Sequence, residues 1–361
     1  MSSRRALHDR YDESHARIRP NRKGTRPRTK NRPKHADAVI ARVVRVDRGR
    51  FTCILDGVTV TAMKARELGR HSVVVGDEVA LVGDVSGAEG TLARIVRAEP
   101  RRTLLRRTAD DTDPVERIIV ANVDIMVIVT AIADPEPRHR LIDRCLVAAY
   151  DAGIHPILVV TKTDLADPSE FLASFAALDV DVITSGRSDS SPISSDACAL
   201  DPAAVEAIRH RLAGHASVLV GHSGVGKSTL VNALVPGLGR TTGHVNEVTG
   251  RGRHTSTSAI AAPLPDDDGW IVDTPGIRSF GLAHVHPEQI ISHFPDLEPG
   301  TDGCPRGCSH DEPDCALDEH VANHPNAELH ASLEARLDSV RRLLRARRGE
   351  SDPPTESTPR P

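Results

Sequence analysis

Alternating apolar and polar residues predict a small β-barrel near the start of the chain. Val58-Thr-Val-Thr-Ala62 alternates as a half-buried strand should, and turn sequences such as Asp56-Gly57 separate this run from its neighbours. Five short strands in about 60 residues fit a small Greek-key barrel. Such barrels often bind oligonucleotides, and a purely structural barrel is the alternative. The expected strands cover residues 39–46, 51–55, 58–63, 78–82 and 91–96.

A different pattern begins near residue 118, where wholly apolar runs alternate with helix-like segments. This alternation predicts a parallel sheet with helices on both faces. A ligand would then bind at the carboxyl ends of the strands. The expected strands cover residues 123–130, 157–160, 217–220 and 270–272, and the expected helices cover residues 138–152 and 229–234.

A last helix is expected over residues 327–348, because apolar residues recur there at helical spacing. The apolar stripe should pack on the rest of the chain. The arginines on the other face and at the end of the helix have two possible roles: they contact RNA, or they form a helix end that is exposed to solvent. The stripe consists of Leu329, Leu333, Leu337, Val340 and Leu344, and the arginines are Arg341, Arg342, Arg345, Arg347 and Arg348.

The segment between the expected strand 217–220 and the helix after it has the pattern of a phosphate-binding loop, G-x-x-x-x-G-K-S. Gly221 and Gly226 allow the backbone to fold tightly, so that its N–H groups point at anionic oxygens near a helix N-terminus. Lys227 is expected to reach the β- and γ-phosphates, and Ser228 to ligate Mg²⁺. The expected nucleotide-binding residues are Gly221, His222, Ser223, Gly224, Val225, Gly226, Lys227, Ser228 and Thr229.

Asp273-Thr-Pro-Gly276 follows the expected strand 270–272. A carboxylate in this position is expected to hold the Mg²⁺ shell. Gly276 is expected to offer its backbone N–H to the γ-phosphate. The next residue is Ile277, which can neither donate nor accept a hydrogen bond, whereas a glutamine often orients the attacking water there.

The polar segment Gly250–Ser258 is expected to be the switch loop. Either Thr255 or Thr257 would contact Mg²⁺ and the γ-phosphate. His254 is a candidate to replace the missing glutamine, and a passive loop histidine is the alternative. Slow intrinsic hydrolysis that a partner stimulates is the resulting hypothesis.

Thr161-Lys162-Thr163-Asp164 follows the expected strand 157–160 and predicts recognition of guanine. A carboxylate at Asp164 can accept two hydrogen bonds from the N1–H and N2–H₂ edge of guanine, which adenine cannot supply. The first residue of this motif is usually Asn, and the Thr161 hydroxyl is expected to bridge to the phosphate loop more weakly. Residues 182–186, with Ser185, are expected to be the loop that contacts the guanine O6.

These motifs occur in an unusual order, since the guanine motif precedes the phosphate loop, and the chain is therefore interpreted as a circularly permuted GTPase. Together with Gly252–Thr257, Asp273–Arg278 and a Cys/His cluster, the motifs resemble those of the small-ribosomal-subunit-dependent circularly permuted GTPases, also called ribosome small subunit-dependent GTPase A. The resemblance covers residues 38 to 345. It implies an OB barrel, a permuted GTPase and a C-terminal zinc domain, acting late in maturation of the small ribosomal subunit.

Cys304, Cys308, His310 and Cys315 predict one structural Zn²⁺. Three cysteines and one histidine close a tetrahedron without an open position. Metal ligation would supply folding energy to a segment that is short, polar and poor in apolar residues. His320 and His324 are the less favoured alternative ligands. The isolated cysteines are interpreted as ordinary structural residues; they are Cys53, Cys145 and Cys198.

The composition of the chain bears on its partner and on its location in the cell. Residues 1–35 hold 12 Lys or Arg and 3 Asp or Glu, a net charge of +9, although the whole chain has a net charge of −4. A basic arm attracts phosphate backbones, and a tail without a partner is the alternative. No apolar run is long enough to span a membrane, so neither a membrane span nor a secretory signal is expected. The resemblance implies that the partner is the small ribosomal subunit with its rRNA, and the chain is expected to be a cytoplasmic monomer.

The predicted architecture is multidomain, with an OB-type β-barrel, a circularly permuted α/β P-loop GTPase and a zinc-binding helical domain. The leading hypothesis is an enzyme that hydrolyses GTP with Mg²⁺. The alternatives are an RNA-binding protein in which GTP or GDP only sets the conformation, and a nucleotide-dependent enzyme acting on a small molecule. The expected boundaries are 1–36 for the basic arm, 37–103 for the barrel, 104–285 for the GTPase, 286–348 for the zinc and helical domain, and 349–361 for a disordered tail.

Overall fold

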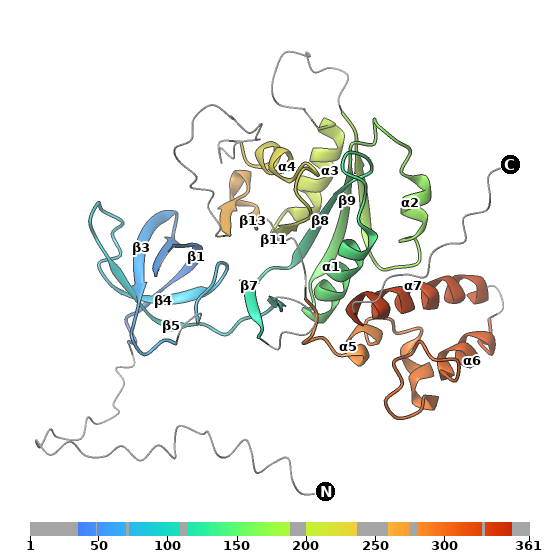
Figure 1. Cartoon of the computed structure of the whole chain (residues 1–361). Helices are drawn as coiled ribbons and strands as arrows, with labels where there is room; N and C mark the ends of the chain where they lie inside the picture. Colours follow the sequence, from blue (N-terminus) through green and yellow to red (C-terminus); the bar gives the residue numbers. More distant parts are fainter. Residues whose placement is uncertain are drawn as a thin grey trace, which may run out of the picture. The chain divides into compact units, whose positions relative to one another are not determined.

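The structure is a computed structural model (Figure 1). It describes residues 35–47, 49–69, 72–108, 115–187, 200–236, 259–274, 281–326 and 329–348. The candidate catalytic residues His254, Thr255, Thr257 and Gly276 lie outside the described residues, as does Ile277. The domain boundaries given above remain predictions.

Five strands form a closed barrel, as the alternation predicted. Their order is β1-β2-β3-β5-β4, and β4 pairs back onto β1 to close the barrel. Only the β3–β5 pair is parallel among these five strands. The inward side chains, such as those of Val43, Val60 and Ile95, are fully buried. The strands are β1 (Val39–Asp47), β2 (Arg50–Leu55), β3 (Val58–Lys64), β4 (Glu78–Gly83) and β5 (Ala93–Ala98).

Six further strands form the expected α/β sheet, in the order β10-β9-β8-β11-β13-β12. All neighbours are parallel except β12, which is antiparallel to β13. The guanine motif follows β9 and the phosphate loop follows β11. The strands are β8 (Ile125–Ala131), β9 (His155–Thr161), β10 (Asp181–Ser185), β11 (His215–Val220), β12 (Ile260–Pro263) and β13 (Gly269–Asp273).

Helices cover both faces of this sheet, as predicted (Figure 1). Every residue of the central strand β8 is buried, and alternate side chains enter two different cores. Met126 and Ile128 pack in the core that contains the residues of α1 (His139–Asp151). Val127 and Val129 pack in the core that contains α3 (Pro202–Leu212) and α4 (Lys227–Leu234). A smaller helix, α2 (Ser169–Ala173), lies between β9 and β10 in the chain.

Strand β12 joins the barrel to the α/β sheet, a connection that the sequence did not predict. Arg45 of β1 faces Ile260 of β12, and Ile260 faces Asp273 of β13. Asp273 in turn faces Leu219 of β11, so one row of paired residues runs from the barrel to the strand before the phosphate loop. The short strands β6 (Leu104–Arg107) and β7 (Arg117–Ala121) form a separate antiparallel pair, and η3 (Pro265–Asp267) precedes β13.

The last part of the chain is helical. The apolar stripe of α7 is buried at Leu333, Leu337, Val340 and Leu344, as expected. Leu329 is an exception, because it precedes the helix and is 44% exposed. No helix in the described ranges is both long and apolar enough to cross a membrane. The elements are α5 (Pro287–Ile291), η4 (Glu298–Gly303), α6 (Ala316–Ala322) and α7 (His330–Arg348).

Candidate nucleotide site and metal centre

The sequence-predicted nucleotide residues gather at one edge of the sheet. Strands β10, β9, β8, β11 and β13 are parallel neighbours, so their carboxyl ends meet there. Thr161 ends β9, Ser185 ends β10 and Asp273 ends β13, while the phosphate loop begins directly after Val220 of β11. The fold therefore brings together motifs that are far apart in the chain.

The phosphate loop has a backbone that only glycine can adopt at two of its positions. Gly226 begins α4 with φ of 95°, in the left-handed region. At Gly221 there is no room for a side chain, because a Cβ atom there would lie 2.2 Å from the carbonyl oxygen of Val129. The sequence assignment of these two glycines to a tight phosphate-binding turn thus has a steric basis.

The Lys227 ammonium group lies over this loop. Its Nζ atom donates hydrogen bonds to the carbonyl oxygens of Gly221 and His222, each at 2.6 Å. Burial lowers the pKa of Lys227, and the nearby Asp273 carboxylate opposes that shift. A buried cation beside a carboxylate is stabilised further by an anionic ligand, which suits a phosphate group.

Thr161 links the guanine motif to the phosphate loop. Its side chain is buried, and its Oγ1 donates to the carbonyl oxygen of Val225 at 2.8 Å. The same oxygen lies 3.1 Å from the carbonyl oxygen of Thr130, and one hydroxyl hydrogen serves only one acceptor at a time. The prediction that this hydroxyl bridges to the loop is confirmed.

The other residues of the guanine motif are held by the loops beside them. Lys162 has φ of 59°, and its Nζ donates to the carbonyl oxygen of Asp134. The exposed Asp164 carboxylate accepts a hydrogen bond from the backbone N–H of Arg187 at 2.9 Å. The contribution of Asp134 was missed, since a backbone carbonyl leaves no signature in the residue type.

Residues 182–186 are not the loop that was expected. Asp181–Ser185 form strand β10, which pairs in parallel with β9. Val182, Ile183 and Thr184 are β-branched, which favours a strand over a loop. Ser185 is buried, and its carbonyl oxygen accepts from the N–H of Thr163 at 3.4 Å. The turn next to the guanine motif therefore begins only after Ser185.

Asp273 is buried at the end of β13. The next residue, Thr274, is also buried and donates its hydroxyl hydrogen to the carbonyl oxygen of Leu219 at 2.7 Å. This bond fixes the end of β13 against the strand that leads into the phosphate loop. A carboxylate so placed, with the Ser228 hydroxyl on the loop, offers the oxygen ligands that Mg²⁺ prefers.

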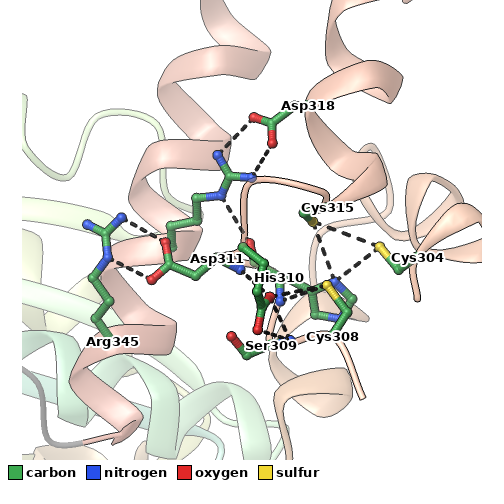
Figure 2. A network of polar contacts seen from close by, with 10 residues as sticks. Cys304, Cys308, Ser309, His310, Asp311, Cys315, Asp318 and Arg345 are labelled. Carbon is green, nitrogen blue, oxygen red and sulfur yellow. Dashed lines mark hydrogen bonds and ion pairs between the residues drawn. The ribbon is translucent and has the colours of Figure 1, made fainter. Parts of the chain in front are cut away.

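The four predicted metal ligands converge in the C-terminal part (Figure 2). The ligand atoms of Cys304, Cys308, His310 and Cys315 all lie within 4.8 Å of one another. The sulfurs of Cys304 and Cys315 are 3.8 Å apart, and the Cys304 sulfur is 3.5 Å from the His310 Nδ1. A tetrahedral Zn²⁺ with ordinary bond lengths separates two thiolates by about 3.8 Å and a thiolate from an imidazole nitrogen by about 3.6 Å. The donor set therefore fits zinc.

The arginines of α7 neither form a solvated helix end nor present a free surface. Arg341 donates to the carbonyl oxygen of His310 at 3.0 Å and forms a two-bond ion pair with Asp318. Arg345 pairs with Asp311 in the same manner, and Figure 2 shows this pair beside the ligand cluster. On the other side, Arg342 contacts Asp143 of α1. These arginines connect the metal-ligand segment to the GTPase domain.

The strand order and the position of the motifs define a circularly permuted GTPase. A family model described as RsgA GTPase matches residues 98–283, about half of the chain. The chain belongs to this family, and it is a GTP-hydrolysing enzyme with GTP or GDP as its nucleotide and Mg²⁺ as the usual ion. A protein that uses GTP only to set its conformation is not favoured.

Two curated relatives illustrate the similarity. The small ribosomal subunit biogenesis GTPase RsgA of Pseudomonas aeruginosa strain LESB58 is 41% identical over 248 residues, which cover 68% of this chain and 69% of the relative. The protein of the same name from Gemmatimonas aurantiaca is 38% identical over 261 residues, which cover 72% of this chain and 81% of the relative.

Two solved structures share the fold. The structure of YjeQ from Thermotoga maritima matches with a TM-score of 0.57 and 24% identity, covering 87% of this chain and 100% of that chain. The structure of YloQ, described as a circularly permuted GTPase, matches with a TM-score of 0.55 and 20% identity, covering 88% and 98%.

Proposed function

We propose that this chain hydrolyses GTP during biogenesis of the small ribosomal subunit, and that the subunit with its rRNA stimulates hydrolysis. The names of the curated relatives support this role. The net charge of +9 on residues 1–35 supports a partner with a phosphate backbone. Such a partner places the protein in the cytoplasm, where we expect it to act as a monomer.

In the proposed arrangement, backbone N–H groups of residues 221–226 surround the phosphates, and Lys227 contacts the β- and γ-phosphates. Ser228 and Asp273 would hold Mg²⁺, which neutralises charge that develops on the phosphates. Asp164 would accept the guanine N1–H and N2–H₂, and the turn after Ser185 would contact O6. His254, with Thr255 or Thr257, and Gly276 would complete the catalytic group.

Zinc would have a structural role in this enzyme. Cys304, Cys308, His310 and Cys315 would supply all four ligands of a tetrahedral Zn²⁺, which would leave no position for a substrate. Burial lowers the pKa of His310, which favours the neutral imidazole that a metal requires. The segment would act as a fixed domain, for which we propose the boundaries 286–348, following a GTPase domain over 104–285 and a barrel over 37–103.

The observation that carries the proposal is the hydrogen bond from Thr161 to Val225, which joins the guanine motif to the phosphate loop. The test is the GTPase rate of the full chain with and without purified small subunits. The rate should rise severalfold with small subunits and stay unchanged with large subunits. Lys227→Ala should abolish turnover in both conditions. Equal rates with and without small subunits would contradict the ribosomal role.

A further inference from the structure

A cavity of about 490 Å³ lies where barrel strands β1, β2 and β4 meet β12 and β13. It is separate from the edge of the sheet that carries the nucleotide motifs. Its wall combines apolar, aromatic and charged side chains. The lining includes Ile40, Arg42, Ile54, Asp56, Glu78 and Trp270.

Trp270 is the only tryptophan of a chain with 2% aromatic residues, and its side chain is only partly buried. The Arg42 guanidinium lies over its ring, 5.4 Å from the centroid. A guanidinium over an indole ring is a cation–π pair of two planar groups. Unpaired nucleobases stack on such aromatic and guanidinium planes in proteins that bind single-stranded RNA.

Two carboxylates line the same cavity as the Arg42–Trp270 pair. Glu78 forms an ion pair with Arg42 at 3.4 Å, and it therefore positions the guanidinium. Asp56, in the turn between β2 and β3, has φ of 48° and is exposed. An ionised carboxylate accepts hydrogen bonds only, so a ligand that contacts it must present N–H or O–H donors, and a base presents N–H.

We propose that this cavity binds an unpaired guanine of single-stranded RNA. The base would stack on the Arg42–Trp270 pair, and its N1–H and N2–H₂ groups would donate to the Asp56 carboxylate. Adenine, cytosine and uracil do not present two adjacent donors of this kind. The assignment rests on the proposed function insofar as an rRNA would be the source of the guanine.

Charge elsewhere in the chain favours RNA binding. The two carboxylates by themselves repel phosphates. However, residues 1–35 carry a net charge of +9. A segment of this charge raises the affinity of the chain for an RNA backbone.

Trp270 also provides a direct readout, because no other tryptophan contributes to the fluorescence. The full chain is titrated with octaribonucleotides of uridine that carry one central guanosine, adenosine or cytidine. The guanosine oligonucleotide should quench Trp270 most strongly and bind most tightly. Asp56→Asn should remove the preference for guanosine, while Asp47→Asn, outside the cavity wall, should keep it.

A fluorescently labelled oligonucleotide gives binding without using Trp270. By fluorescence anisotropy, Trp270→Leu should raise the Kd by about 5- to 150-fold, the usual loss for one stacked base. Circular dichroism and GTP binding check that the variant is folded. Oligonucleotides that bind but leave Trp270 fluorescence unchanged, or that do not bind at all, would overturn the proposal.

These outcomes are distinguishable from a failure of the ribosomal role. Quenching by guanosine without stimulation of GTPase activity by small subunits would support the cavity and remove the proposed function. Stimulation by small subunits with no effect of oligonucleotides on Trp270 would support the proposed function and remove the guanine site.

Discussion

Thr161 occupies the position where the motif usually has asparagine, and its hydroxyl still holds the phosphate loop. The hydroxyl of this buried residue donates to Val225 and also lies near the carbonyl of Thr130. Thr161→Val keeps the shape of the side chain but leaves buried carbonyl oxygens unpaired. We expect the free energy of unfolding to fall by about 1–3 kcal/mol and GTP to bind more weakly. Thr161→Ser, measured beside it by denaturant unfolding and calorimetry, should retain most of both quantities.

Asp164 gives the sharpest prediction about base selection. Asp164→Asn keeps an acceptor oxygen for the Arg187 N–H but loses the negative charge that would face guanine. Hydrogen bonds to charged groups contribute roughly 1.5–3 kcal/mol each, so the Kd for GTP should rise about a hundredfold or more. Binding of a xanthine nucleotide should improve. The control is Asp167→Asn, in the same loop, where the carboxylate accepts from the N–H and the hydroxyl of Ser169. Unchanged GTP affinity in Asp164→Asn would remove the guanine assignment.

The sequence predicts those site residues that act through a particular side chain, or, in the case of glycine, through the absence of a side chain. Gly221 and Lys227 belong to this group, and so does Cys304. It did not predict partners that contribute a backbone atom, such as Asp134, or partners that a distant helix supplies. Arg341 is the clearest case, since nothing near it in sequence shows that it contacts the carbonyl oxygen of His310.

At the scale of elements, strands with a strong local pattern were predicted with ends close to those observed. Strand β12 was missed, because it has four residues and is defined by partners that come from far along the chain. Strand β6 was missed because Leu-Leu-Arg-Arg has no alternation. For β10, the position after the guanine motif indicates a loop, whereas the β-branched residues favour the strand that the structure has.

The metal-ligand segment should depend on zinc for its structure. Its four ligands lie within 12 residues, and the loop that carries two of them is held to α7 by hydrogen bonds from Arg341 to the His310 carbonyl oxygen and from Arg345 to the Asp311 carboxylate. Elemental analysis should find about one zinc per chain. Cys308→Ser should lose the metal and unfold this segment, seen as proteolysis within residues 298–326, while GTP binding remains. Cys198→Ser should behave as the unaltered chain does. Full zinc occupancy in Cys308→Ser would point to another ligand set.

At the scale of the whole molecule, the basic first segment should act through long-range charge. It holds 12 Lys or Arg and 3 Asp or Glu in residues 1–35. Each phosphate contact contributes about 0.7–0.9 to the slope of log affinity against log salt concentration. Removing residues 1–35 should therefore weaken binding to the small subunit and flatten its salt dependence, without changing GTP affinity. An unchanged slope in the truncated chain would show that the segment makes no phosphate contacts.

The continuous sheet gives the nucleotide a route to the barrel. The paired row Arg45, Ile260, Asp273 and Leu219 crosses from β1 to the strand before the phosphate loop. Ile260 also begins β12, directly after the expected switch loop. A change of conformation at Asp273 or in that loop would therefore displace β12, a strand that is hydrogen-bonded to β1 of the barrel. If the barrel contacts the subunit, nucleotide and subunit must bind with coupled affinities.

This coupling has a thermodynamic test that does not depend on the rate of hydrolysis. A non-hydrolysable GTP analogue should tighten binding to the small subunit relative to GDP, and by reciprocity the subunit should tighten the analogue by the same factor. A coupling free energy of about 1–3 kcal/mol corresponds to roughly 5- to 150-fold. Ala261→Pro removes a backbone N–H from β12, which should reduce this factor while leaving nucleotide affinity of the free protein nearly unchanged. Ala259→Pro, placed just before the strand, is the matched control. Equal subunit affinity in the GDP and analogue states would show that the paired row transmits nothing between the two sites.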